Sequence, residues 1–344
     1  MTSPLWMVTQ EPALTRLVGY LSREKDAIME AGRHRLRFSR QELEEARVAF
    51  GRMIRRGEEK LHRLCELLSE TFLGSCDLQS VVVGELPATG ERFTITHAIA
   101  SSDLYSQTDL DLGTRALARF RVHDGRQWAE PDLVANFVEY LPTEPNDLDI
   151  HKFISRIKAE EEIWNKVVDE IFSLDALVRR DKKLRHLSRF VKDVFGLKAV
   201  VGDDPKRAHT LQKALRGLTW SPEVLRKHRV PAEEGTERLR FVEVKNYLSS
   251  ERKLSGWAAL KSVVTWWDGV FEIQVQALGS YHRERERLTR ESHTSFKFSR
   301  ERLRNQIAEE MPLFGFYRDL LRWLFLEPGE PPPLFPGVEI EVGD

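Results

Sequence analysis

The chain has 344 residues and a formal net charge of −1, so it is long enough for one large or two ordinary domains but has no global basic field for nucleic acid. Its two cysteines, Cys65 and Cys76, exclude a disulfide framework and a zinc cluster and favour a reducing compartment. We see no signal-peptide pattern and no apolar run long enough to span a bilayer, so we expect a cytoplasmic protein without membrane contact.

The first part of the chain, residues 1–149, mixes helical and strand-like patterns. Apolar residues recur at helical spacing over 12–31 and again from Ser39 to Phe72. Ser39 followed three residues later by Glu42 is a capping-box pattern, which predicts the start of the second helix.

The pattern of apolar residues changes from helical to strand-like after residue 79. Residues 81–83 and 93–95 read as short strands, whereas 131–141 reads as a short helix with a proline near its start. The pair Asp109 and Asp111 is of a kind that binds magnesium in some proteins but is common in turns. A turn-rich stretch after residue 141 marks the expected domain boundary.

Cations gather around the first element after this boundary. Residues 152–158 read as a strand that carries Arg156 and Lys158, and the helix predicted directly after it carries Lys166. A triphosphate needs several fixed cations within reach of one another. The alternative is a surface strand with basic residues.

The next segment contains a basic amphipathic helix over 174–191 and then a mostly buried strand over 197–201. Asp193 stands just before this strand. A crossover helix is expected over 205–218.

A strand of alternating apolar and polar residues lies at 271–276. Asp268-Gly269 joins it to the strand before it as a hairpin. Its polar positions, Glu272, Gln274 and Gln276, form a row of acceptors that suits a metal ion, although an edge strand with a solvated face has the same pattern. A charged helix and a helical stretch broken at Pro312 are expected after it.

Six short motifs follow one another through this half of the chain. They are Arg156-x-Lys158 with Lys166, Asp193-x-x-Gly196-x-Lys198, Lys245-Asn246-Tyr247, Gly256-Trp257, Glu272-Ile273-Gln274-Val275 and His293-x-x-Phe296-Lys297. In this order, residues 150–297 resemble the synthetase domain of RelA/SpoT-type alarmone enzymes. The resemblance implies an α+β fold with a nucleotidyltransferase-like mixed sheet flanked by helices, preceded here by a helical and mixed N-terminal region. It also implies transfer of pyrophosphate from ATP to the 3′-hydroxyl of GDP or GTP.

The resemblance also implies roles for individual residues. The residues implied to bind ATP are Arg156, Lys158, Lys166 and Lys198. Those implied to act in catalysis and to bind Mg²⁺ are Asp193 and Glu272, the latter also activating the 3′-hydroxyl. Those implied to bind the acceptor are Lys245, Tyr247, Trp257, Gln274, His293 and Lys297.

Several positions depart from the pattern of the family. Glu162 stands where the family has Ser, Lys198 where it has Arg, and Gln276 where it has another Arg. The family's Ser-x-His after the aromatic motif becomes Ala259-Leu260-Lys261. We therefore expect a divergent member, and because the family's His-Asp hydrolase motif does not occur in 1–149, we expect no alarmone hydrolase activity.

Two alternatives stay open beside this hypothesis. Some toxin-like relatives of the family pyrophosphorylate the 3′ end of tRNA, and the basic run from Arg179 to Arg185 favours that acceptor. The substituted motif residues favour a catalytically degenerate nucleotide-sensing or protein-binding module. We divide the chain into 1–149, the synthetase-like region 150–327 and a Pro-rich tail 328–344; the first region is a candidate for self-association or for binding a regulatory protein.

Overall fold

The computed structural model describes residues 11–31, 33–86, 89–123, 128–157, 160–172, 194–248, 258–290 and 304–343. They belong to two compact units that are interleaved along the chain. The first unit comprises Met1–Arg56, Lys158–Lys192 and Thr294–Asp344, and the second comprises Gly57–Ile157 and Asp193–His293. The expected boundary at residue 149 falls inside the second unit. None of the helices in the described ranges is both long and apolar enough to cross a membrane.

The first unit is mainly helical. It contains α2 (Pro12–Glu30), the start of α3 (Arg40–Phe72), α6 (Glu160–Ile171), α12 (Pro312–Phe325) and a parallel pair of strands, β1 (His34–Ser39) and β12 (Val338–Gly343). Trp164 stacks on Phe325 with ring centroids 3.8 Å apart and packs against Phe50, which joins three of these helices. The expected Pro-rich tail therefore ends in a strand that pairs with the segment before α3.

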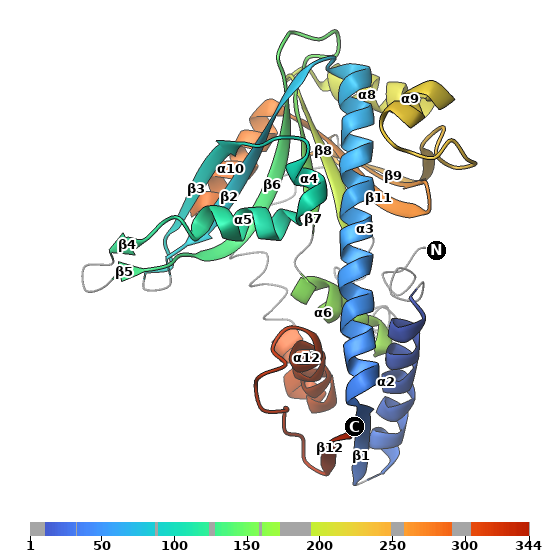
Figure 1. Cartoon of the computed structure of the whole chain (residues 1–344), viewed down its shortest axis with the longest axis vertical. Helices are drawn as coiled ribbons and strands as arrows, with labels where there is room; N and C mark the ends of the chain where they lie inside the picture. The colour runs from blue at the N-terminus through green and yellow to red at the C-terminus, as the bar shows by residue number, and fades with distance from the viewer. Residues whose placement is uncertain are drawn as a thin grey trace. The chain divides into compact units, whose positions relative to one another are not determined.

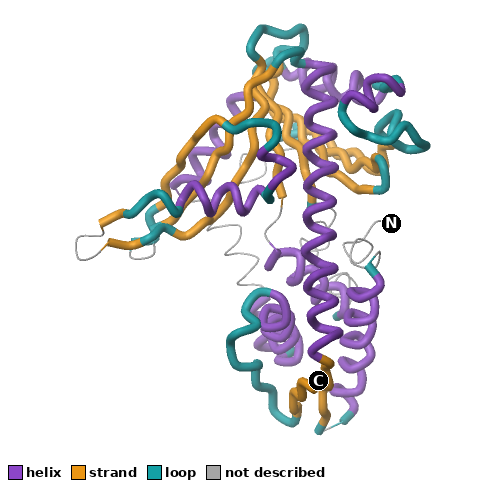
Figure 2. The backbone as a smooth tube through the Cα atoms, in the orientation of Figure 1, coloured by secondary structure: helices purple, strands orange, loops and turns teal. Residues whose placement is uncertain are grey.

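The second unit is built on one eight-stranded sheet (Figure 2). Its spatial order is β3 (Arg92–Ala98), β2 (Cys76–Glu85), β6 (Asp132–Pro142), β7 (Ile150–Ile157), β8 (Phe195–Val201), β11 (Gly269–Ala277), β10 (Leu260–Trp266) and β9 (Arg240–Asn246). Neighbouring strands are antiparallel except β8 and β11, which are parallel. β4 (Val122–His123) and β5 (Trp128–Ala129) form a separate small antiparallel ribbon.

Helices cover both faces of this sheet (Figure 1). On one face, Gln212 of α8 (Pro205–Gly217) donates to Ser262, and Asp109 of α5 (Asp109–Leu117) lies 3.5 Å from the Ser155 hydroxyl. On the other face, α10 (Leu278–Arg290) packs Tyr281 on the sheet. The expected α+β class, a mixed sheet flanked by helices, is confirmed.

The segment expected as a helix at 131–141 is instead β6, and the prediction was wrong. The proline precedes the strand, and the eleven residues of β6 pair with β2 on one side and β7 on the other. Val138 and Tyr140, whose side chains suit a pleated surface, are completely buried. Pairing on both edges outweighed a weak helix-start signal.

The hairpin of β10 and β11 is confirmed, with Trp266 opposite Gly269 at its turn. However, β11 is not an edge strand with a solvated face. It lies between β8 and β10, and its polar residues Glu272, Gln274 and Gln276 are 2%, 8% and 0% exposed. Polar groups buried to this extent usually have partners within the protein. Glu272 has such partners and lies in the candidate site, whereas the side-chain amide of Gln276 has no hydrogen-bond partner among the described residues.

Candidate functional site

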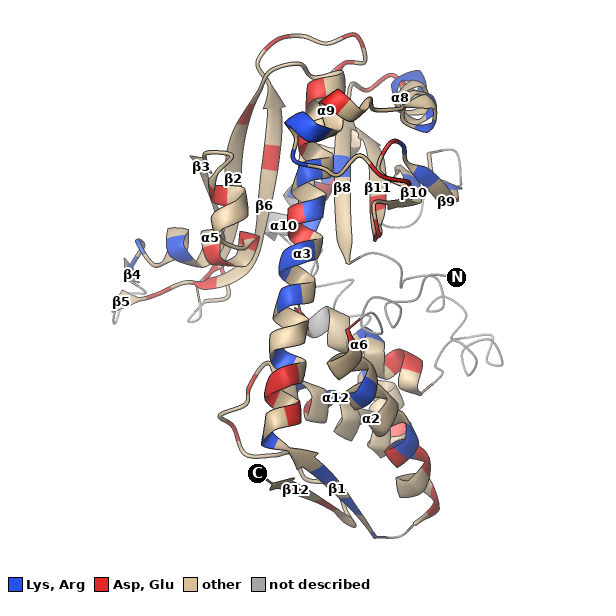
Figure 3. Cartoon of the chain, turned by 45° about the vertical axis from the view of Figure 1, so that its right-hand side comes forward, with Lys and Arg blue, Asp and Glu red and all other residues tan. Residues whose placement is uncertain are grey.

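Two adjacent rows of residues cross the centre of the sheet on the face that α10 packs against. In the first row Arg156, Gly196 and Glu272 lie side by side on β7, β8 and β11, and Glu243 of β9 continues the row. The second row contains Lys198, Gln274, Lys261 and Lys245 on β8, β11, β10 and β9. Because residues directly opposite one another in a sheet share a face, all these side chains leave the same surface. The charged positions of β8, β9 and β11 are visible in Figure 3.

Carboxylates of the first row neutralise lysines of the second. Lys261 forms an ion pair with Oε2 of Glu272, and the Gln274 amide donates to the Oε1 atom of the same carboxylate. Lys245 lies directly opposite Lys261, but its ammonium is 2.8 Å from Glu243 on its own strand. Like charges opposite one another destabilise a sheet, and these ion pairs relieve that repulsion.

A third ion pair joins the sheet to α10. The Lys198 ammonium lies 2.8 Å from Glu284, and the lysine side chain is 11% exposed. Burial lowers the pKa of Lys198, and Glu284 opposes this shift. For Glu284, burial acts to raise the pKa, but Lys198, Gln276 and Arg156 together outweigh it and leave the pKa below its ordinary value. Each group thus favours the charged form of the other.

A network around Glu139 of β6 fixes α10 over the sheet. This carboxylate is 1% exposed and accepts from Gln79 and Lys152, each at 2.8 Å, and from the Tyr281 hydroxyl at 3.1 Å. Arg285 approaches it at 3.4 Å. Burial acts to raise the pKa of Glu139, but Lys152, Gln79 and Arg285 together outweigh that effect and the pKa is lowered. The network holds α10, and hence Glu284, in register with β8.

The rows enclose a small cavity. Its described lining comprises Arg156, Val194, Gly196, Leu197, Lys198, Glu272 and Gln274. The cavity has a volume of about 20 Å³, which is room for about one water molecule. Gly196 leaves the space between Arg156 and Glu272 without a side chain. Arg156 also belongs to this lining, and its positive charge helps to lower the pKa of Glu284.

The structure brings together four of the predicted site residues, Arg156, Lys198, Glu272 and Gln274. Lys245 lies two strands away on the same face, and the backbone of Tyr247 extends the pairing of β9 and β10 by donating to Ala259. Lys166 belongs to the first unit, where it is 1% exposed and acts on the pKa of Asp169.

The remaining predicted residues lie outside the described residues. These are Lys158, Asp193, Trp257, His293 and Lys297, together with the basic run 179–185. Of the two expected magnesium ligands, Asp193 and Glu272, the structure therefore describes Glu272 alone. Among the residues that are described, no group of three or more His, Cys, Asp or Glu side chains is placed to hold a metal ion.

The sequence reasoning missed Glu284 and Glu139 and treated Lys261 as a lost family residue. A signal for Glu284 was present, because it stands three residues after Tyr281 and therefore on the same side of a helix. Lys261 as a partner of Glu272 follows from strand register, which single-sequence patterns do not give.

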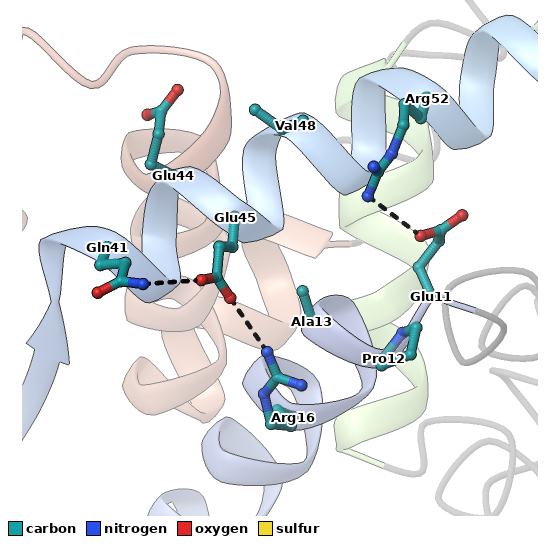
Figure 4. Close-up of a pocket in the computed structure, with 9 residues that line it drawn as sticks. All are labelled: Glu11, Pro12, Ala13, Arg16, Gln41, Glu44, Glu45, Val48 and Arg52. Atoms are coloured by element: carbon teal, nitrogen blue, oxygen red, sulfur yellow. Dashed lines mark hydrogen bonds and ion pairs between the residues drawn. The ribbon is translucent and has the colours of Figure 1, made fainter.

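A larger hollow of about 700 Å³ lies in the first unit between α2 and α3 (Figure 4). Its charged groups are already paired, four of them with one another and Glu44 with Arg47 outside the lining. Arg16 lies 3.2 Å from Glu45, which also accepts from Gln41, and Arg52 lies 3.7 Å from Glu11. Since both signs are paired, this hollow has no excess charge aimed at a ligand, and we place the candidate site on the sheet.

No protein-family model matches this sequence, and no curated protein matches it. Among solved structures, the chain is similar to the small alarmone synthetase 1 from Bacillus subtilis, with 13% identity and a TM-score of 0.22 over 47% of this chain and 82% of that one. It is also similar to the structure of a small alarmone synthetase 1 from Bacillus subtilis bound to its product pppGpp, with 16% identity and a TM-score of 0.23 over 48% and 83% of the two chains. Likenesses at these TM-scores do not identify a function for this chain.

Proposed function

We propose that this chain binds ATP against the cationic rows of the sheet and transfers its pyrophosphate group to the 3′-hydroxyl of GDP or GTP. One observation carries the proposal. Arg156, Lys198 and Glu272 come from three separate motifs of the chain, and they line one cavity on one face of the sheet.

The charges of the site suit this chemistry. Pyrophosphate transfer depends mainly on positioning and on neutralising phosphate charge. Arg156, with its planar guanidinium, binds two phosphate oxygens at once, and Lys198 adds a point charge on the neighbouring strand. Lys245, farther along the same face, contacts the acceptor phosphates.

In the proposed step, the 3′-oxygen of the acceptor attacks the β-phosphorus of ATP. The bond from that phosphorus to the bridging oxygen of the α-phosphate breaks, and AMP leaves with the electron pair. Glu272 accepts the proton of the attacking hydroxyl. The cavity of about 20 Å³ is far smaller than a nucleotide, so binding requires its lining to move apart.

The resemblance to alarmone synthetases implies magnesium, but the described residues do not fit a magnesium site. Magnesium needs several oxygen ligands in near-octahedral geometry. Glu272, the one predicted ligand that is described, is already ion-paired with Lys261. We therefore assign no step of the reaction to a metal ion.

The test is transfer of label from γ-labelled ATP to GDP, GTP or tRNA, each offered separately to the full-length chain. We expect labelled guanosine product and a loss of at least about 100-fold in turnover for Glu272→Gln, because a proton acceptor contributes about 10²–10⁴-fold. Glu223→Gln, which changes an exposed carboxylate on α9 (Pro222–Lys227), is the matched control. Unchanged turnover in a folded Glu272→Gln protein contradicts the role of Glu272 as proton acceptor. Label on tRNA instead of on a guanosine nucleotide would show that tRNA is the acceptor.

A second candidate function, nucleotide binding without transfer, is favoured by one observation. The carboxylate of Glu272 is neutralised by Lys261 and also accepts from Gln274, so it already has partners where a proton acceptor needs access to substrate. Calorimetry that detects ATP or GTP binding by a protein that transfers no label supports this function over the first.

A further inference from the structure

The surroundings of Glu272 differ from those of a metal-binding carboxylate. Its side chain is 3% exposed; Oε1 accepts a hydrogen bond from the chain itself, whereas Oε2 has an ion-pair partner but no hydrogen bond among the described residues. Lys261 pairs with Oε2, and Gln274 donates to Oε1. A buried carboxylate requires a compensating positive charge, and here a lysine on the neighbouring strand provides it.

Strand register makes Lys261 this partner. Glu272 lies directly opposite Val263, and Lys261 lies two residues before Val263 on the same face of β10. It is therefore a diagonal cross-strand neighbour of Glu272, at a distance that a long side chain spans. A histidine, which the family resemblance implies at this position, is shorter and is largely uncharged at neutral pH. The substitution places a permanent charge where the pattern has none.

The other charges of the rows fit the same interpretation. Lys198 pairs with Glu284 and Lys245 with Glu243, so each described lysine of the second row has its own carboxylate. Arg156 is a further cation in the described lining of the cavity, and its charge also acts on Glu284. Among these described residues, four cations stand beside three carboxylates, which favours an anionic group such as phosphate.

We infer that the Lys261 ammonium occupies the position of a divalent cation beside Glu272, so that this carboxylate coordinates no metal and the cavity binds phosphate through fixed side-chain cations. A divalent ion at Glu272 would lie close to an ammonium of the same sign inside a partly water-excluded site, where repulsion is strong. The identity of the phosphate ligand rests on the proposed function, whereas the exclusion of metal rests on the ion pair alone.

Whether Lys261 excludes a divalent ion from Glu272 is tested by titrating the full-length chain with Mn²⁺ and following the electron paramagnetic resonance signal. We expect the wild-type and Glu272→Gln proteins to bind the same number of Mn²⁺ ions with the same affinity. We expect Lys261→Gln to gain a Mn²⁺ site, and the double variant with Glu272→Gln to lose it again. A wild-type Mn²⁺ site that Glu272→Gln abolishes overturns the inference, and so does a folded Lys261→Gln protein without a new site.

Two further variants separate the charge from the loss of a side chain. Lys261→Arg keeps the positive charge, and it should exclude Mn²⁺ as the wild type does even if Lys261→Gln does not fold. Lys152→Gln also removes a lysine that is ion-paired with a buried carboxylate, but Glu139 keeps Gln79, Tyr281 and Arg285. It should gain no Mn²⁺ site. Mn²⁺ binding by Lys261→Arg at the level of Lys261→Gln contradicts the charge argument.

The second part of the inference is that fixed side-chain cations bind phosphate without a metal ion. It is tested by calorimetry of ATP binding, once with excess EDTA and once with Mg²⁺. We expect dissociation constants within about threefold of each other, because the cations that bind phosphate belong to the chain. Loss of ATP binding by tenfold or more in EDTA overturns this half of the inference. Absence of ATP binding under both conditions contradicts the proposed function instead, and it leaves the manganese result to decide the role of Lys261.

Discussion

At the scale of single residues, the face of the sheet opposite the candidate site carries a second buried group of charges. His62 of α3 lies 2.9 Å from Asp109 and 3.0 Å from the Tyr140 hydroxyl, and Glu58 accepts from the Asp109 backbone at 2.7 Å. Burial raises the pKa of Glu58 to about 8, and the nearby Asp109 carboxylate acts in the same direction. For His62, burial opposes the protonated form, but Asp109 outweighs it and the pKa is raised. Both groups therefore bind a proton more tightly in the folded chain.

This cluster predicts that the second unit becomes more stable as the pH falls from about 8 to about 5. The folded pKa of Glu58, about 8, lies above its ordinary value of 4.5, so the folded state holds a proton that the unfolded state releases. The free energy of unfolding should fall as pH rises through that interval, by up to about 1.4 kcal/mol per pH unit. Urea unfolding between about pH 5 and pH 8 measures it.

Glu58→Gln is the control for this pH dependence, because its amide oxygen still accepts the Asp109 backbone hydrogen bond but does not titrate. The free energy of unfolding should decline less steeply with pH in this variant. The remaining decline comes from His62, whose raised pKa changes the stability in the same direction. Equal slopes in the two proteins would show that Glu58 does not hold its proton.

At the scale of elements, α3 is one continuous helix of 33 residues that contains two glycines. A side chain at Gly57 would meet the Phe195 ring, since a Cβ atom there would lie 2.0 Å from its Cζ atom. A Cβ atom at Gly51 would meet nothing within 4 Å. Gly57 therefore permits the close approach of α3 and the start of β8, the strand that carries Lys198.

The two glycines give a matched pair of variants. Gly57→Ala should destabilise the chain by about 1–3 kcal/mol, because overpacking outweighs the better helix propensity of alanine. Gly51→Ala should stabilise it by about 0.5–1 kcal/mol, because alanine has the better helix propensity and its side chain meets no other atom there. Thermal and urea unfolding measure both, and a stabilising Gly57→Ala contradicts the contact with Phe195.

At the scale of the whole molecule, the two units are not consecutive pieces of sequence. Three of the eight strands of the large sheet, β2, β3 and β6, come from residues before 149, and the other five come after it. β6 lies between β2 and β7 and pairs with both. A region that begins at residue 150 therefore lacks one side of its own sheet.

We predict that the fragment 150–327 does not fold alone. It would expose the edge of β7 and would lose the Glu139 carboxylate that holds Lys152 and Tyr281. We expect a broad, non-cooperative loss of circular dichroism on heating, whereas the full-length chain unfolds in defined transitions. A sharp transition in the fragment would support an independent synthetase-like region with the sequential boundary at 149.

Local sequence patterns were enough to predict the elements whose side chains repeat with a clear period. The hairpin of β10 and β11, the strand β7 and the helix α6 after it were predictable because alternation and helical spacing are local properties of the chain. The order of the motifs also indicated which residues to follow, and Arg156, Lys198, Glu272 and Gln274 do line one cavity.

The tertiary structure alone decided what those residues contact. β6 is a strand because two neighbours pair with it, and Glu272 is buried because β11 lies at the centre of the sheet rather than at its edge. Lys261 pairs with Glu272 because the register of β10 sets it diagonally across from that carboxylate. Burial and register are properties of strands far apart in sequence, and a shift of one residue in the pairing would send Lys261 to the opposite face.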